Sequence, residues 1–104
     1  MNQRMPFAVH KLIEEMGELQ QVLGKLMAFP EGPHPDGGPP LQQRLAEESI
    51  DVLAALTYFM EKFGFNDTTV FDEATIEALK DRLDDKYEKF VQWGKLHDKS
   101  PEEV

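Results

Sequence analysis

Residues 50–60 read IDVLAALTYFM, and this stretch decides the fold. It spans three helical turns and is apolar on nearly every side, which is typical of a helix that is covered all round. Three helices of one chain struggle to supply that cover, whereas a second copy of the chain can complete a four-helix bundle. We therefore expect an all-α protein of antiparallel helices, whose four-helix-bundle-type core is completed by oligomerisation into a homodimer or homotetramer.

Outward from this stretch, two breaks divide the chain into three helical segments. The first break is FPEGPHPDGGPP, residues 29–40, where proline and glycine exclude a continuous helix. The second is the Gly-Asn-Asp-Thr-rich segment 63–69. Pro6 suits a first helical turn, Gly64 a helix C-terminus and Asp72 with Glu73 a helix start. The expected helices are 6–28, 41–63 and 71–97.

The outer two helices show ordinary amphipathic patterns. The first has an apolar side and a polar side, and the third has an apolar stripe that we expect to face the core. The apolar side of the first helix comprises Leu12, Met16, Leu19, Leu23, Leu26 and Met27. Its polar side comprises Lys11, Glu14, Glu15, Glu18, Gln21 and Lys25. The stripe of the third helix comprises Ile76, Leu79, Leu83, Tyr87 and Phe90.

Length, charge and composition narrow the function classes. The 104 residues fit a single domain, 1–104. With 20 acidic against 11 basic residues, the net charge of −9 argues against nucleic-acid polymers and anionic membranes as partners. The absence of cysteine excludes disulfides and thiolate metal sites. No signal peptide or membrane-spanning run is apparent, so we expect a soluble, cytoplasmic protein.

Two pairs of acidic residues are the strongest functional signal. Asp51 lies inside the apolar run. Burying an ionised carboxylate there without a partner would cost the fold on the order of several kcal/mol. Glu48 shares the helix face of Asp51. Glu15 and Glu18 repeat the three-residue spacing, with Glu14 beside them. Contact between the first two helices would join the pairs into an all-oxygen cage suited to Mg²⁺ or Mn²⁺.

Iron is disfavoured, because helical di-iron sites use Glu-x-x-His on facing helices. The one such spacing here, Glu31 to His34, lies in the Pro/Gly loop.

The two acidic segments together resemble a known family. KLIEEMGELQQVLGK (residues 11–25) followed by LAEESIDVLAALTYF (residues 45–59) is similar to the MazG-like, all-α nucleotide pyrophosphohydrolase superfamily, which includes dimeric dUTPases and phosphoribosyl-ATP pyrophosphohydrolases. Its signature is Glu-Glu-x-x-Glu, a spacer, then Glu-x-x-Asp. The matching helices cover about half of the chain, and the spacer is longer than in the simplest members.

The resemblance implies an activity and a role for each acid. The activity is Mg²⁺-dependent hydrolysis of a nucleoside triphosphate between the α- and β-phosphates, giving a monophosphate and pyrophosphate, as in nucleotide-pool cleaning. Glu14 and Glu15 are the implied catalytic residues, Glu14 as a further ligand or as the group that orients the attacking water. The implied metal ligands are Glu15, Glu18, Glu48 and Asp51.

Other features leave alternatives open. Loop 29–40 is interpreted as a lid, as part of a base pocket or as disordered. Phosphoribosyl-ATP hydrolysis uses the same acid pattern, and an acidic helical interaction protein without catalysis would need no metal. The candidate substrate-binding residues are Lys11, Lys25, Tyr58, Lys86, Lys89 and Trp93. The sequence favours a structural explanation for the lysines, as solvated side chains in i,i+4 ion pairs, and for Tyr58, as a core residue.

Overall fold

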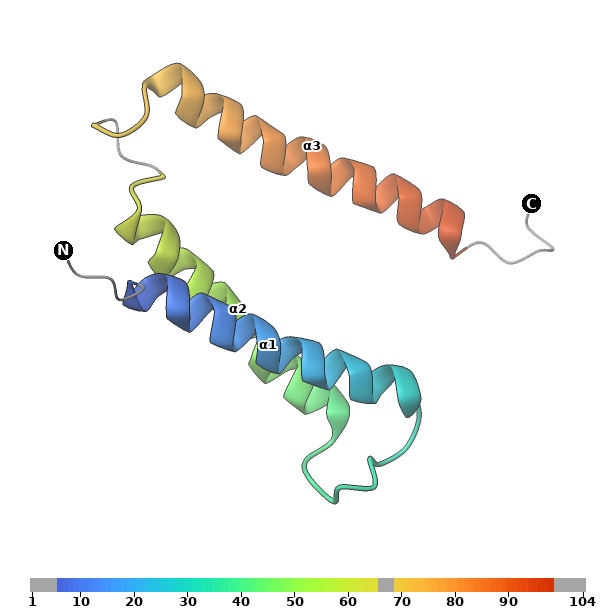
Figure 1. Cartoon of the computed structure of the whole chain (residues 1–104). Coiled ribbons are helices and arrows are strands. Elements are labelled where there is room, and N and C mark those ends of the chain that lie inside the picture. Colours follow the sequence, from blue (N-terminus) through green and yellow to red (C-terminus); the bar gives the residue numbers. More distant parts are fainter. Residues whose placement is uncertain (1–5, 66–68, 99–104) are drawn as a thin grey trace. The chain divides into compact units, whose positions relative to one another are not determined.

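The computed structural model describes residues 6–65 and 69–98, and within these ranges the chain is all-α, as expected, with no strand. Its helices are α1 (Phe7–Ala28), α2 (Leu41–Lys62) and α3 (Glu73–His97) (Figure 1). Part of the second predicted break, residues 66–68, lies outside the described residues. No helix within those ranges has both the length and the apolar character that crossing a bilayer requires.

The chain divides into two compact units, Met1–Phe63 and Gly64–Val104, which are considered separately. The first contains α1, the Pro/Gly loop and α2, and the second contains α3. That the two units form one domain stays a prediction.

The helix ends follow the local sequence, with small corrections to the predicted bounds. Pro6 precedes α1 instead of occupying its first turn, and its carbonyl accepts from the N–H groups of Val9 and His10, both at 3.1 Å. Pro40 likewise precedes α2, and its carbonyl accepts a hydrogen bond of 3.1 Å from the N–H of Arg44. Gly64, at φ +68°, follows the end of α2 as predicted, since glycine adopts the left-handed conformation without steric cost.

The start of α3 is set by a side-chain cap. The carboxylate of Asp72 accepts a hydrogen bond of 2.7 Å from the Thr75 N–H, so the helix begins at Glu73 and not at residue 71. Hydrogen bonding from the Thr75 side chain, together with this bond from its N–H, holds the pKa of Asp72 below its ordinary value.

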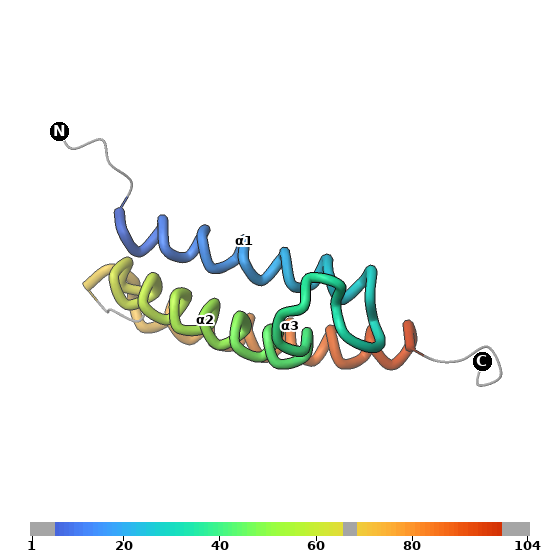
Figure 2. The backbone as a smooth tube through the Cα atoms, turned by 90° about the horizontal axis from the view of Figure 1, so that it is seen from below, coloured from blue at the N-terminus to red at the C-terminus, as the bar shows by residue number. Residues whose placement is uncertain are grey.

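Helices α1 and α2 lie side by side in both views of the backbone (Figures 1 and 2). The ring of Phe7, at the beginning of α1, contacts that of Tyr58, near the end of α2. The two buried residues of each helix are fourteen residues apart, which is two seven-residue repeats and is expected of a packed helix pair. We call this contact the seam; its buried members are Ala8 and Val22 on α1, and Leu41 and Ala55 on α2.

The apolar faces predicted for α1 and α3 need correction. On α1, Met16, Leu23 and Met27 are exposed, because the seam runs along Ala8 and Val22 instead. On α3, Ile76 is the one buried member of the predicted core stripe. The other members, Leu79, Leu83, Tyr87 and Phe90, are exposed.

Loop 29–40 is tied to both helices of the first unit through Asp36. The guanidinium of Arg44, at the start of α2, donates two hydrogen bonds of 2.8 Å to the Asp36 carboxylate, and Lys25 of α1 pairs with it at 3.1 Å. These contacts hold the pKa of Asp36 well below its ordinary range, with the Arg44 hydrogen bonds as the largest cause. A Cβ on Gly38 would lie 2.7 Å from Nη2 of Arg44, so glycine lets the guanidinium close onto the loop.

Candidate metal centre

Two carboxylates occupy the middle of the seam. Glu15 lies seven residues from both Ala8 and Val22, and Glu48 lies seven residues from both Leu41 and Ala55. On the Phe7 side of these carboxylates the buried residues of the seam are Ala8 and Ala55. On the loop side they are Val22 and Leu41. The central layer of an otherwise apolar contact is therefore acidic.

The structure brings the predicted acids together around Glu15. Carboxylate oxygens of Glu15, Glu48 and Asp51 all lie within 4.8 Å of one another, and those of Glu14, Glu15 and Glu18 do the same. Glu15 belongs to both groups, so the acids of α1 and α2 form one continuous cluster. We call these five residues the acid cluster.

Two oxygens of the acid cluster are buried without a hydrogen-bond partner, namely Oε2 of Glu15 and Oε2 of Glu48. Buried polar atoms are nearly always paired, and an unpaired one costs about 1–3 kcal/mol. The Glu15 side chain is only 12% exposed. Two orphaned oxygens that face the same cluster therefore need a proton, a water molecule or a cation.

The pKa of Glu15 is raised above its ordinary value. Burial is the largest cause, and the neighbouring charges of Glu18 and Asp51 add to it. The ammonium of Lys11, 3.6 Å from Oε1 of Glu15, acts in the opposite direction but does not cancel these effects. The charged form of Glu15 is thus under-compensated by the protein alone.

The donor set fits a hard divalent cation. The two groups contain carboxylates alone, and Mg²⁺ and Mn²⁺ prefer such oxygen ligands. Glu15 and Glu48 would hold the ion with their orphaned oxygens, with Asp51 and Glu18 completing the set. Glu14 is exposed at the edge of the cluster, where its carboxylate pairs with the ammonium of Lys11 at 3.4 Å.

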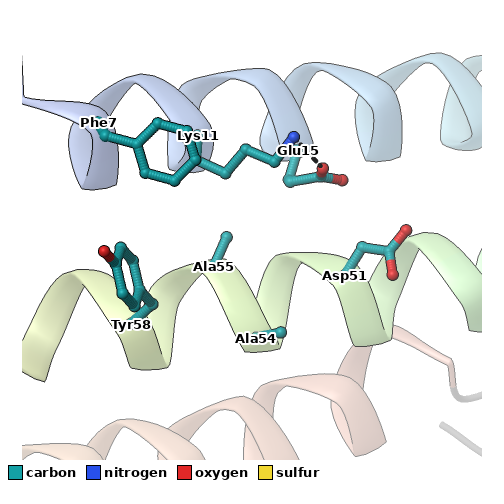
Figure 3. Close-up of a pocket in the computed structure, with 7 residues that line it drawn as sticks. All are labelled: Phe7, Lys11, Glu15, Asp51, Ala54, Ala55 and Tyr58. Carbon is teal, nitrogen blue, oxygen red and sulfur yellow. Dashed lines mark ion pairs between the residues drawn. The ribbon is translucent and has the colours of Figure 1, made fainter.

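The acids that the structure buries differ from the acid that was predicted to be buried. Asp51 was expected to be buried in the apolar run, but it is exposed, whereas Glu15 and Glu48 are partly buried. The reason is that α2 turns Ala55 and Glu48 toward α1, which leaves Asp51 at the side of the seam. Its carboxylate still reaches the space beside Glu15 (Figure 3).

The candidate substrate-binding residues fall in different places. Lys11 and Tyr58 line a cavity with Glu15 and Asp51 (Figure 3). Lys25 instead pairs with Asp36 of the loop. Three others, Lys86, Lys89 and Trp93, belong to the second unit, where the two lysines share a helix face with Asp81 and Asp85 and the Trp93 ring contacts Phe90.

Sequence reasoning missed Phe7, Ala54 and Ala55, which line the same cavity. A signal for Phe7 was present, because it precedes Lys11 and Glu15 by steps of four residues and so shares their helix face. No known protein family, curated protein or solved structure matches this chain.

Proposed function

We propose that this protein is a Mg²⁺-dependent nucleotide pyrophosphohydrolase, in which a triphosphate is cleaved between its α- and β-phosphates. The observation that carries the proposal is the pair of unpartnered, buried oxygens of Glu15 and Glu48 in the middle of an apolar seam. A fold gains nothing from such a layer by itself, since apolar residues of similar size pack there at lower cost. A bound cation would pair with the two oxygens and would therefore explain why the layer is acidic.

A divalent ion at the cluster would supply charge neutralisation for the phosphate oxygens and a lowered pKa for water. The residues of the chain have separate tasks. Glu15, Glu18, Glu48 and Asp51 would hold the ion, and Glu14 would accept a proton from the attacking water. Water adds across the α–β anhydride, so the products are a nucleoside monophosphate and pyrophosphate.

Lys11 is the candidate phosphate contact in this unit. Its ammonium lies 3.4 Å from Glu14 and 3.6 Å from Glu15, and the Glu14 charge is the largest cause of its raised pKa. Lys11 therefore carries its charge at neutral pH. A cation that engaged the Glu15 carboxylate would remove one of the two acidic partners of Lys11, and its ammonium would remain paired with Glu14 beside the cluster.

The exposed apolar surfaces support the proposal of a second copy. Ile13 and Met16 on α1, and Ile50 and Leu53 on α2, remain exposed although they are large and apolar. Apolar patches of this kind mark interaction surfaces. A second copy that covers them would complete an antiparallel four-helix bundle, as a homodimer or homotetramer.

The test is a pyrophosphate-release screen of the purified chain with Mg²⁺ against common and damaged nucleoside triphosphates, with phosphoribosyl-ATP included. We expect turnover that is lost in Glu48→Gln and retained in Glu47→Gln, because Glu47 is exposed and pairs with Gln43 at 2.9 Å. Absence of turnover, together with no thermal shift by Mg²⁺, would overturn the proposal and favour a helical interaction protein.

A further inference from the structure

An open cavity of about 400 Å³ adjoins the acid cluster, between the beginning of α1 and the end of α2 (Figure 3). Its volume falls in the range of about 300–1,000 Å³ that is usual for small-molecule sites. Along α1 it is lined in turn by Glu15, Lys11 and Phe7. This is a span of about 12 Å at the rise of an α-helix, and it runs from carboxylate through ammonium to aromatic ring.

The aromatic end is built from two rings of facing helices. The centroids of Phe7 and Tyr58 lie 6.3 Å apart, with their planes at 80°. Tyr58 is also held by Lys62, whose ammonium sits 5.4 Å from its ring centroid. Phe7 is 67% exposed, so most of its ring is accessible to a ligand. Between the rings and the acids, the small side chains of Ala54 and Ala55 leave the space open.

Two rings at right angles suit a planar ligand, which can stack on one ring and meet the edge of the other. Of the described residues that line the cavity, the polar ones are Lys11, Glu15, Asp51 and Tyr58. The first three lie toward the acid cluster. Lys62 contacts the Tyr58 ring but does not line the cavity, so the polar side-chain group in the lining of the aromatic end is the Tyr58 hydroxyl. A hydroxyl rotates to donate or accept as its partner requires.

We propose that the Phe7–Tyr58 end of this cavity binds the nucleobase by stacking, and that it accepts different bases with similar affinity. The inference rests on the proposed function, which places the phosphates at the acid cluster and Lys11. Stacking tolerates every base because each has a π-face. Strong discrimination between bases needs fixed hydrogen-bonding groups that a wrong base leaves unpaired. The hydroxyl of Tyr58 can rotate to donate to one base or accept from another, so it does not select among them.

The experiment measures binding of the reaction products, which are not turned over. Isothermal titration with Mg²⁺ present compares the four common nucleoside monophosphates with pyrophosphate, which has no base. We expect Kd values for the four bases within about tenfold of one another. Phe7→Ala should weaken each nucleotide by about tenfold or more, the usual effect of removing one stacking ring, and should leave pyrophosphate binding unchanged.

Variants of the same residue separate stacking from apolar contact and from misfolding. Phe7→Tyr keeps the ring and should bind like the original chain, whereas Phe7→Leu keeps apolar bulk and should bind like Phe7→Ala. Met27→Ala, at an 85% exposed site on the far end of α1, is the matched control and should change no Kd. Helix content by circular dichroism is compared for all four variants.

Several results would overturn the inference: one base bound over 100-fold more tightly than the rest, equal loss of pyrophosphate binding in Phe7→Ala, full binding in Phe7→Leu, or no nucleotide binding at all. The two proposals fail separately. Phe7-dependent nucleotide binding without any turnover overturns the hydrolase but keeps the base site. Turnover with binding that is insensitive to Phe7 does the reverse.

Discussion

Replacing Glu48 with leucine should stabilise the metal-free protein while abolishing its response to Mg²⁺. Glu48 stands in the seam between two buried neighbours, Leu41 and Ala55, and its Oε2 has no partner. Removing an unsatisfied buried oxygen is worth about 1–3 kcal/mol, and exchanging buried ionic groups for apolar ones gains up to about 4 kcal/mol. Because Glu48 is only partly buried, we expect a gain of about 1–2 kcal/mol in the free energy of unfolding.

The assay is urea unfolding followed by circular dichroism, in EDTA and at one fixed protein concentration, since self-association would shift apparent stability. The expected gain corresponds to a rise of about 5–10 °C in Tm for a chain of this size. In the original protein, Mg²⁺ at 100 times its Kd should add about 2.7 kcal/mol. The Glu48→Leu variant should lose this increment.

Glu47→Leu is the matched control, because it makes the same change one residue earlier at an exposed position outside the acid cluster. Its stability should stay within about 0.5 kcal/mol of the original chain, and its Mg²⁺ response should persist. Destabilisation of metal-free Glu48→Leu by more than about 1 kcal/mol, or an undiminished Mg²⁺ response, would refute the reasoning.

Three further predictions follow from the same structure. Because the folded-state pKa of Glu15 is raised, the folded chain takes up a proton more readily than the unfolded one, so metal-free Tm should increase as pH falls from 7 toward 5, and Glu15→Gln should flatten that rise. The lowered pKa of Asp36 has the opposite effect on stability, because the folded chain releases this proton more readily than the unfolded one. Arg44→Gln should therefore lower Tm at pH 7, and the difference in Tm from the original chain should shrink only below about pH 4. Leu53→Glu, on the exposed apolar face of α2, should shift sedimentation toward the monomer, and an unchanged oligomer would exclude that face from the interface.

Much of the candidate site could be predicted from spacing alone. Acids three residues apart share a helix face whatever packs against it, so the pairs Glu15/Glu18 and Glu48/Asp51 were recognisable in the sequence. Phe7 was not recognised, since an aromatic residue at a helix start is more often part of a core. Only its position beside Tyr58, on another helix, shows that it lines a cavity.

The sequence by itself determined the three helices and their ends. Proline before α1 and α2, Gly64 after α2 and the Asp72 cap of α3 act within one or two turns, so no distant contact is needed to place them. The tertiary structure alone decided which acids are buried. Both helices carry apolar residues on more than one face, and only the register between them selects the seam that buries Glu15 and Glu48 and leaves Asp51 exposed.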